Sequence, residues 1–318
     1  MIYTSILDAH VVSGPVLAGI ALASKYLAAI PTFMWIFFLE VARSAESLRQ
    51  GRPVVAVIGR AVSKIMLWIA VPVVVLLTVN YLHFQALPKS GTGDGYMSAE
   101  FQATLKGNKH YKKRATMSLV EKSVELQLRQ NEYNTQMATY FPPGSNEFDS
   151  VPWTWPLMGK GIVWRLPSKS KKAKQAVILS GNPVVWGAAT TVAIGATATA
   201  TYGVLARTGL PTPDSQQRGT VVGGHGPMFW LVLGYWLNVL PFLMLNRQMF
   251  LHYYLPAYYF SILMVARVLD QCRLPFRVVF SLLLLAGAFQ MSQYLEPLTL
   301  GLKLPKAEFA KRALLMTW

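Results

Sequence analysis

Long apolar runs, separated by polar and basic segments, form the main pattern of this chain. Roughly 20 apolar residues are enough for a helix to cross a hydrocarbon core of about 30 Å. Six runs approach that length, at about residues 14–41, 61–84, 184–206, 228–245, 250–268 and 276–298. The first run is long enough to hold a short re-entrant piece followed by a helix. The pattern therefore predicts an all-α polytopic membrane protein with about six transmembrane helices.

The composition agrees with a membrane protein. Of the 318 residues, 53% are hydrophobic and only 14% are charged, whereas about a quarter of a soluble protein is charged. The net charge of +16 would suit nucleic acid, but no zinc-ligand spacing, aromatic RNA-binding box or Gly-rich phosphate loop accompanies it. In membrane proteins, basic residues collect in loops, where they orient helices and meet anionic lipid. We therefore expect no nucleic-acid partner.

Basic residues in the short loops predict the orientation of the helices. They follow the first, third and fifth apolar runs, at Arg43, Arg49, Arg52, Arg60, Arg207, Arg218, Arg267, Arg273 and Arg277. Alternation places these three loops on one side of the membrane, which we take as cytoplasmic. The segment 85–174 then lies on the lumenal side. It ends in the basic cluster RLPSKSKKAK, but long loops translocate largely regardless of charge.

The apolar runs divide the chain into three predicted regions. Residues 1–84 hold two central spans, residues 85–175 form a lumenal loop, and residues 176–318 form a C-terminal four-helix transmembrane region. Within the loop, an apolar residue recurs every fourth position along SLVEKSVELQLRQNEYNTQM, residues 118–137. That spacing predicts a helix that lies in the plane of the lumenal interface.

The stretch MFLHYYLPAYYF, residues 249–260, places a histidine, four tyrosines and a proline where an apolar run begins. Tyrosine suits the membrane–water interface, and proline is tolerated in the first turn of a helix, so one interpretation is an interfacial anchor. The other is a ligand site. His252 and the nearby Arg247 are ionisable groups at membrane depth, which are costly unless they bind something polar. The residues alone leave both interpretations open.

Three further motifs lie in and after the lumenal loop, and the first two each allow two interpretations. Asp94, within SGTGDGY, either caps a turn through its side-chain oxygen or faces a substrate that passes beneath the loop. Trp153, Trp155 and Trp164 suit an interfacial belt, or they stack on a sugar ring. Asn182, which precedes a proline, is a helix-start signal because asparagine caps and proline fits the first turn.

Taken in order, these motifs resemble the second half of protein O-mannosyltransferases. The matching phrases are SGTGDGYMSAEFQATLKGN, EKSVELQLRQNEYN, WTWPLMGKGIVW, SGNPVVW and RQMFLHYYLPAYYF. ASKYLAA, residues 23–29, is similar to the family's Ser-Lys-Trp stretch, with Tyr26 in place of Trp. The resemblance implies the fold of a C-class glycosyltransferase in the endoplasmic reticulum membrane. It also implies transfer of mannose from dolichyl phosphate mannose to Ser or Thr hydroxyls of secretory-pathway proteins, with inversion at the anomeric carbon.

The resemblance further implies roles for single residues. The residues expected to hold the donor phosphate are Arg247, His252, Tyr254, Asn182 and Lys25. The residues expected in the lumenal substrate groove are Asp94, Trp155 and Trp186. No metal and no cofactor besides the donor lipid are expected. The implied partners are the lipid-linked donor, Ser/Thr-containing protein acceptors, membrane lipid and a second mannosyltransferase subunit in a homo- or heterodimer.

Three departures from the family pattern bear on activity. The family carries an Asp-Glu pair in its first lumenal loop, whose Asp serves as base, and this chain contains no Asp-Glu dipeptide. The β-trefoil MIR domains that follow the FQATLKGN phrase in eukaryotic members are absent here. The family's paired histidines become His252 and Tyr253. No catalytic residue is therefore identified in this chain.

Two hypotheses about function follow from the resemblance. In the first, the chain is the C-terminal part of an active mannosyltransferase, because its sequence opens in the middle of the fold. In the second, it is a short, non-catalytic paralogue that binds the lipid-linked donor or joins a full-length subunit. Catalysis requires a carboxylate from elsewhere, whereas lipid binding requires only the basic residues and an apolar groove.

Overall fold

The computed structural model has two compact units, Met1–Tyr140 and Phe141–Trp318. The residues that the structure describes are 13–24, 26–165, 173–179, 181–207 and 226–313. The boundary between the units falls inside the segment 85–175, which the sequence pattern treats as one lumenal loop. Each unit has its own set of helices and its own packing.

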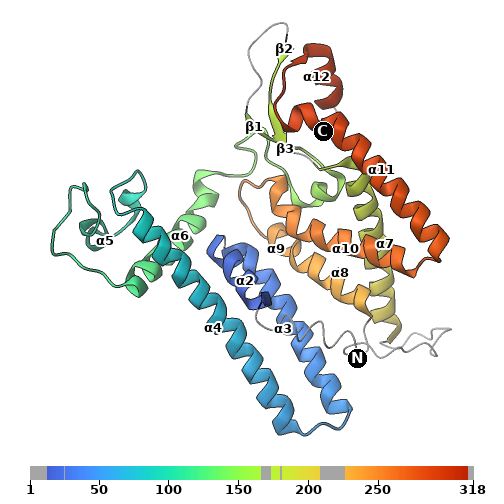
Figure 1. Cartoon of the computed structure of the whole chain (residues 1–318), viewed down its shortest axis with the longest axis horizontal. Helices are drawn as coiled ribbons and strands as arrows, with labels where there is room; N and C mark the ends of the chain where they lie inside the picture. Colours follow the sequence, from blue (N-terminus) through green and yellow to red (C-terminus); the bar gives the residue numbers. More distant parts are fainter. Residues whose placement is uncertain (1–12, 25, 166–172, 180, 208–225, 314–318) are drawn as a thin grey trace. The chain divides into compact units, whose positions relative to one another are not determined.

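The first unit is built on three apolar helices. They are α2 (Ser13–Ser24), α3 (Tyr26–Arg49) and α4 (Val54–Ala86), and α2 packs along both α3 and α4 (Figure 1). The approach of α2 to α4 depends on Gly19, because a Cβ at this position would lie 2.7 Å from Cβ of Val75. The first apolar run thus contains two helical pieces, as its length predicted.

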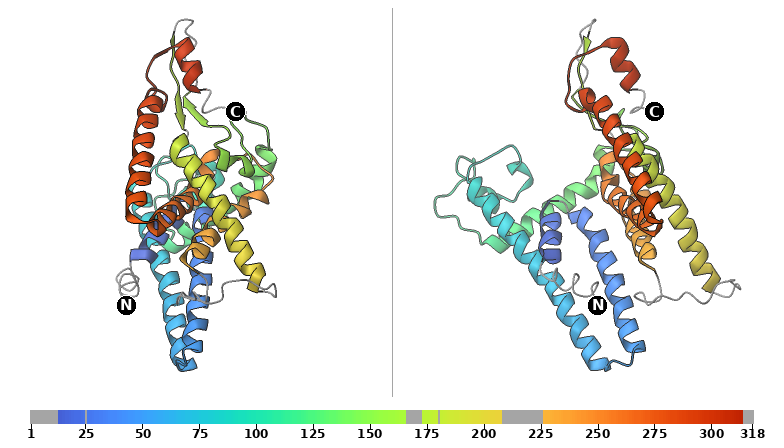
Figure 2. Two further views of the ribbon diagram at one scale, coloured as in Figure 1. Left: turned by 90° about the vertical axis from the view of Figure 1, so that its right-hand side faces the viewer. Right: turned by 45° about the vertical axis from the view of Figure 1, so that its right-hand side comes forward.

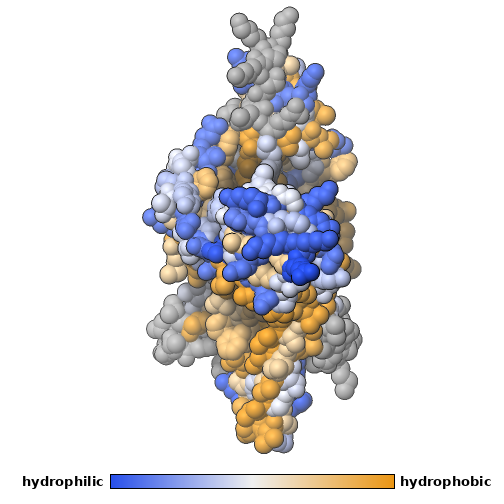
Figure 3. Space-filling model, turned by 90° about the vertical axis from the view of Figure 1, so that its left-hand side faces the viewer, coloured by the Kyte–Doolittle hydropathy of each residue, from blue (hydrophilic) through white to orange (hydrophobic). Residues whose placement is uncertain are grey.

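A polar segment follows α4 in the first unit. It contains η1 (Asp94–Tyr96), α5 (Ala99–Ala103) and α6 (Leu119–Tyr140). A capping box starts α6: Glu121 N donates to Ser118 Oγ at 3.2 Å, and Ser118 N donates to the Glu121 carboxylate at 2.8 Å. The helix predicted over residues 118–137 is confirmed. Figure 3 shows hydrophilic residues gathered over this polar segment, above a largely hydrophobic surface where α4 descends.

The second unit begins with short elements and continues into packed helices. The short elements are η2 (Pro152–Leu157), β1 (Ile162–Arg165), β2 (Ala173–Lys174) and β3 (Val177–Leu179). The helices are α7 (Pro183–Arg207), α8 (Pro227–Leu237), α9 (Leu240–Leu243), η4 (Leu251–Tyr254), α10 (Leu255–Gln271), α11 (Leu274–Thr299) and α12 (Lys306–Ala313). Helices α7, α8 and α10 pack against one another, and α11 lies against α7 (Figure 2).

Short strands cover one end of α11 in the second unit. β1 pairs antiparallel with β3, and β2 pairs antiparallel with β4 (Leu304–Pro305). Leu298, Leu304 and Phe309 form a small buried cluster with Ile178, so α12 is held against the strands. The mostly helical fold class is confirmed. The strands were not predicted, because segments of two to four residues offer no alternation of apolar and polar positions to detect.

Three helices of the described residues, α4, α7 and α11, are long and apolar enough to cross a membrane. They coincide with the predicted runs 61–84, 184–206 and 276–298. Almost none of the apolar surface of α4 and α11 is buried within the protein, as expected of helices that face lipid. The chain is a multi-pass membrane protein.

The fourth apolar run differs from its prediction. Residues 228–245 were expected to form one continuous helix, but α8 ends at Leu237 and the short α9 follows. At the break, the side chain of Asn238 turns back, and its Nδ2 donates to the carbonyl of Gly234 at 2.8 Å. An asparagine side chain that bonds a backbone carbonyl four residues earlier competes with the helical hydrogen bonds, which explains the break in an otherwise apolar sequence.

The fifth apolar run also begins differently from its prediction. Residues 250–268 were expected to be helical from the start, but η4 is a single 3-10 turn and α10 begins only at Leu255. Pro256 occupies the first turn of α10, where the amide that proline lacks would have had no helical partner. Five residues that the pattern assigned to a span therefore precede the α-helix.

Close helix packing in the second unit makes a glycine necessary in α8. A Cβ at Gly234 would lie 2.3 Å from the ring of Phe260, whereas a Cβ at Gly187 in α7 would meet nothing within 4 Å. We predict that Gly234→Ala lowers stability by about 1–3 kcal/mol through overpacking. The matched change Gly187→Ala should be neutral or stabilising by up to about 1 kcal/mol, because alanine favours helix. Thermal unfolding of the purified variants in detergent tests this, and equal melting temperatures would contradict the predicted close packing.

Candidate functional site

Three of the predicted site residues, Arg247, His252 and Tyr254, lie in and just after the non-helical segment 245–250, between α9 and η4. Arg247 is buried, with 5% of its surface exposed, and Tyr254 has no exposed surface. His252 and Tyr253 are half-buried. Arg247, His252 and Tyr254 are close together in the sequence, but their exposure differs: Arg247 and Tyr254 are buried and His252 is half-buried.

Asp149 holds this segment in place. Its Oδ1 accepts from the backbone N of Met249 at 2.8 Å, and its Oδ2 accepts from the backbone N of Gly144 at 2.6 Å. The neighbouring Ser150 donates its backbone N to the carbonyl of Met249 at 2.9 Å. One carboxylate therefore joins the loop 141–150 to the segment before η4, which lies 100 residues away in sequence.

Sequence reasoning missed Asp149. The local signal was present, because Asn146 and Asp149 stand in a loop with Pro and Gly, where such side chains accept bonds from backbone amides. Asn146 does so locally, through Oδ1 to the N of Phe148 at 2.9 Å. The partner of Asp149 at Met249 could not be predicted, because nothing in the local pattern specifies a contact at that separation.

A buried aromatic cluster lies beneath the segment. Tyr254 is its centre, and its hydroxyl lies 3.1 Å from the hydroxyl of Tyr235 on α8. The ring of Trp186 on α7 lies 5.4 Å from that of Tyr254 and stacks on Tyr258 of α10 at 4.1 Å. Trp155 of η2 contributes a further ring at 6.3 Å from Tyr254. Aromatic residues from four elements thus fix the start of α10.

The two tryptophans of this cluster differ from their predicted positions. Trp155 and Trp186 were expected to line a substrate groove, and Trp155 also suited an interfacial belt, but they are 0% and 3% exposed. Their indole N–H groups are satisfied internally, Trp155 Nε1 by Ser150 Oγ and Trp186 Nε1 by the carbonyl of Trp155, both at 2.9 Å. A buried indole needs such a partner. Trp153 and Trp164 are exposed, as the belt interpretation expects.

Asn182 and Tyr254 were expected to donate hydrogen bonds to a phosphate, and the structure gives both of them structural partners. Asn182 Oδ1 accepts from the N of Val184 at 3.1 Å and so caps α7, as its helix-start interpretation predicted. Its Nδ2 donates to the carbonyl of Ala288 at 2.7 Å and to Ser292 Oγ at 3.0 Å on α11. The Tyr254 hydroxyl lies beside that of Tyr235, so both side chains already have partners within the protein.

The ring of His252 is held between its neighbours in sequence. It stacks on Phe250 at 5.9 Å and lies 4.4 Å from the ring of Tyr253. Tyr253 in turn stacks on Phe242 of α9 at 5.4 Å. The tyrosine that replaces a family histidine therefore packs as an aromatic ring here, and it links His252 to α9.

Asp94, in the first unit, organises a turn. Its Oδ2 accepts from Ser90 Oγ at 2.5 Å, from Gly91 N at 3.0 Å and from Asn108 Nδ2 at 3.0 Å. These bonds, that from Ser90 foremost, lower the pKa of the Asp94 carboxyl below its usual 3.8. The lowered pKa means that the turn is stabilised at neutral pH and loses this stabilisation as pH falls below about 4. The turn-capping interpretation of Asp94 is confirmed.

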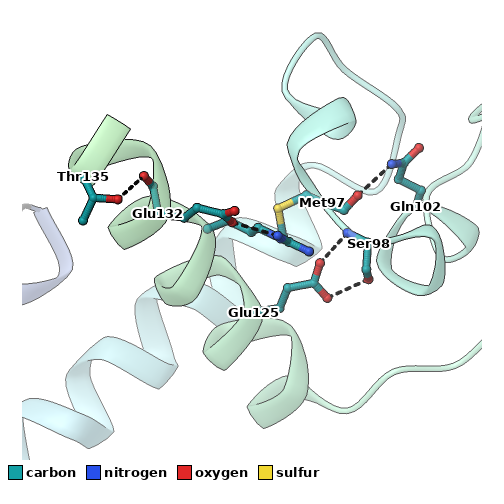
Figure 4. A network of polar contacts seen from close by, with 7 residues as sticks. Met97, Ser98, Gln102, Glu125, Glu132 and Thr135 are labelled. Atoms are coloured by element: carbon teal, nitrogen blue, oxygen red, sulfur yellow. Dashed lines mark hydrogen bonds and ion pairs between the residues drawn. The ribbon is translucent and has the colours of Figure 1, made fainter. Parts of the chain in front are cut away.

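The loop that Asp94 organises is fastened to α6 (Figure 4). Ser98 Oγ donates to Glu125 Oε2 at 2.9 Å, and the Ser98 amide donates to the other oxygen of the same carboxylate. Gln102 Nε2 donates to the carbonyl of Met97 at 2.8 Å. Farther along α6, Arg129 pairs with Glu132 at 2.8 Å.

A cleft of about 420 Å³ opens between this loop and α6. The rings of Tyr96 and Tyr133 meet edge to face at 5.9 Å on its wall. Arg129, Gln130 and Asn134 add a cation and two amides. The cleft thus combines aromatic and apolar surface with a few hydrogen-bonding side chains, as ligand pockets commonly do.

Two other expectations concern Lys25 and metals. Lys25 lies outside the residues that the structure describes. Among the described residues, no three His, Cys, Asp or Glu side chains are grouped closely enough to hold a metal ion.

Comparison with known proteins identifies a family that matches most of this chain. Residues 119–318 match the family model described as the C-terminal four TMM region of protein-O-mannosyltransferase. Dolichyl-phosphate-mannose–protein mannosyltransferase 1 of Candida albicans is 37% identical over 148 residues, which make up 46% of this chain and 15% of that protein. Protein O-mannosyltransferase 1 of Drosophila pseudoobscura pseudoobscura is 31% identical over 159 residues, or 50% of this chain and 16% of that protein. The matches thus cover only a small part of these relatives.

A solved structure also resembles this chain. It is that of the S. cerevisiae protein O-mannosyltransferase Pmt1-Pmt2 complex bound to the sugar donor, with a TM-score of 0.76 and 15% sequence identity. The match covers 95% of this chain and 68% of the other. At that identity the likeness establishes the fold alone.

The carboxylate of Asp149 accepts two backbone amides, and an amide side chain offers only one oxygen. We predict that Asp149→Asn lowers stability by about 1–3 kcal/mol, because one backbone amide loses its acceptor and the other loses a charged one. The matched control is Glu147→Gln, an exposed change in the same loop, which should leave stability unchanged. Thermal unfolding, with hydrogen exchange at residues 246–250, tests the prediction. Equal exchange in both variants would show that Asp149 does not hold the segment.

Proposed function

The chain belongs to the protein O-mannosyltransferase family, and we propose that it takes part in transferring mannose from dolichyl phosphate mannose to Ser and Thr hydroxyls of secretory-pathway proteins. We place it in the endoplasmic reticulum membrane, where such acceptors enter. The observation that carries the proposal is the family match over residues 119–318, which includes the whole segment of Arg247 and His252.

In this proposal, Arg247 and His252 bind the donor phosphate. A guanidinium presents a planar fork of donors that matches phosphate oxygens, and it stays charged at any physiological pH. With 5% of its surface exposed, Arg247 would meet the phosphate in a largely dehydrated setting, where charge–charge attraction is stronger than in water. As the bond to mannose breaks, negative charge grows on the phosphate, and a fixed cation stabilises it.

The surroundings of the segment supply the rigidity that such a site needs. Asp149 fixes the backbone at Met249, and the aromatic cluster fixes Tyr254. A cation held in place before the substrate arrives does not have to be reorganised during the reaction. We therefore propose that Tyr254, Asn182, Trp155 and Trp186 position the site and do not touch the phosphate.

The cleft of the first unit is proposed as a contact for the protein acceptor. Tyr96, Tyr133 and Arg129 offer aromatic and hydrogen-bonding surface to an extended peptide. Asp94 shapes the loop beside this cleft, because its carboxylate is engaged by the turn that it caps. That engagement also argues against Asp94 as the general base.

The general base is proposed to come from outside these 318 residues. An inverting transfer needs a carboxylate that takes the acceptor proton opposite the leaving phosphate. The family's Asp-Glu pair has no counterpart in the sequence. A partner subunit, or the remainder of a longer chain, would supply it; the solved relative is itself a complex of two mannosyltransferases.

The absence of an Asp-Glu pair from this sequence also supports a second candidate function. A non-catalytic member of the family would bind the lipid-linked donor, or would pair with a full-length subunit, without transferring mannose. Donor binding alone uses Arg247, His252 and apolar surface. The two candidates therefore share a binding site and differ in whether transfer follows.

Removing the proposed phosphate contact should weaken donor binding. We expect Arg247→Ala to reduce affinity for dolichyl phosphate mannose by roughly 10- to 100-fold, the cost of a charged hydrogen-bonding group. The donor affinity of Arg247→Lys should lie between that of Arg247→Ala and that of the unchanged chain, because lysine keeps the charge but lacks the planar pair of donors. Binding is measured with purified protein in detergent, and unchanged affinity of the alanine variant with an unchanged melting temperature would exclude the phosphate role.

The missing base leads to a separate prediction about activity. The purified 318-residue chain should bind the donor and transfer no mannose to a Ser/Thr-rich peptide. If the donor used in catalysis binds to this chain, adding a full-length family subunit should produce mannose transfer. Arg247→Ala in this chain should then reduce that transfer. Turnover by the chain alone would show that a carboxylate within it acts as base.

A further inference from the structure

The turn that joins α3 to α4 carries a concentration of positive charge. Arg49, Arg52 and Arg60 are exposed around it. Among the described residues, Arg52 and Arg60 form no ion pair, and Arg43 lies 3.6 Å from its only carboxylate, Glu40. The end of this helical pair therefore presents several guanidinium groups to the surroundings. Charge of this kind is attracted to an anionic membrane surface.

An apolar cavity of about 750 Å³ lies between α3 and α4. Its walls include Phe33, Phe37, Leu48, Ile65 and Trp68. Phe37 and Ile65 are 56% and 46% exposed, so part of the wall is open to the outside. A cavity of this volume and lining is in the range of sites that bind apolar ligands.

The basic turn and the apolar cavity meet. A small adjoining cavity of about 50 Å³ is lined by Arg52 and Arg60 as well as by Glu40, Arg43 and Ser44. The last three residues also line the large cavity. Glu40 is shared between two cations, since Lys64 Nζ lies 3.1 Å from its Oε2 and Arg43 Nη1 lies 3.6 Å from the same atom. The rim between the two cavities thus keeps a net positive charge.

We propose that this part of the first unit binds an anionic glycerophospholipid. An acyl chain would fill the space between α3 and α4, and the phosphate would lie against Arg52 and Arg60. The order of surfaces, apolar cavity and then basic rim, matches the order of groups along a lipid molecule. Arginine binds phosphate through paired N–H donors. This site is separate from the Arg247 segment, and the proposal does not depend on the proposed function.

Other occupants fit these surfaces less well. Free phosphate would use the rim and leave the apolar walls uncovered. An apolar helix of another protein would cover the walls but would bring no counter-charge for Arg52 and Arg60. Only a molecule with both a negative headgroup and a hydrocarbon chain satisfies the two surfaces together, by apolar burial and by charge complementarity.

The test titrates the purified, delipidated chain with dioleoyl phosphatidylserine and with dioleoyl phosphatidylcholine, and counts bound lipid by native mass spectrometry. We expect a phosphatidylserine site that phosphatidylcholine does not fill. Each basic residue near a lipid surface contributes roughly a fivefold factor, so Arg52→Gln with Arg60→Gln should weaken phosphatidylserine binding about 30-fold. The matched control is Arg273→Gln, another exposed arginine at a helix-joining turn, which should leave binding unchanged.

A second variant examines the apolar half of the site. Ile65→Trp should narrow the cavity and weaken phosphatidylserine binding, while the melting temperature shows that the chain still folds. Equal binding of the two lipids would overturn the proposal, as would an equal loss in Arg273→Gln. Unchanged phosphatidylserine binding by Ile65→Trp would overturn the acyl-chain assignment. Displacement of phosphatidylserine by dolichyl phosphate at equal concentration would replace the phospholipid with a polyisoprenoid carrier.

Discussion

The second unit depends on one physical constraint: the backbone between α9 and η4 is not helical, yet its amides and carbonyls need partners. A buried peptide group without a hydrogen bond is costly, so such a segment persists only where other groups satisfy it. The loop 141–150 provides them. Asp149 and Ser150 pair with Met249, and Phe141 accepts from Gln248 at 2.9 Å. The loop thus allows Arg247 to stand outside any regular helix.

The aromatic cluster has a related consequence. Trp155, Trp186 and Tyr254 are buried together, and each of their polar tips has a partner within the protein. Trp155 and Trp186 were expected to line the substrate groove and Tyr254 to bind the phosphate, but all three instead fix the segment that carries Arg247 and His252. Positioning of this kind matters in a transferase, because a displacement of about 1 Å at a reacting group can reduce the rate roughly 100-fold.

The two units distribute charge differently. The second unit buries Arg247, whereas the first unit gathers exposed arginines at the turn between α3 and α4. A buried cation interacts strongly with a single anion, and exposed cations interact with a charged surface that salt partly screens. Two small groups of basic residues among those behind the net charge of +16 therefore have different proposed uses. Arg247 serves the proposed substrate site, and Arg52 and Arg60 serve the proposed lipid site.

The sequence by itself determined the helical class, three of the membrane-crossing helices, the amphipathic α6 and the caps at Asn182 and Asp94. These features follow from residues close together in the chain, through hydrophobic periodicity and side-chain-to-backbone bonds. Only the tertiary structure decided that Trp155 is buried and that Asp149 binds Met249. Those outcomes arise from contacts between distant segments, whose free energy depends on which groups packing brings together. No local pattern encodes that choice.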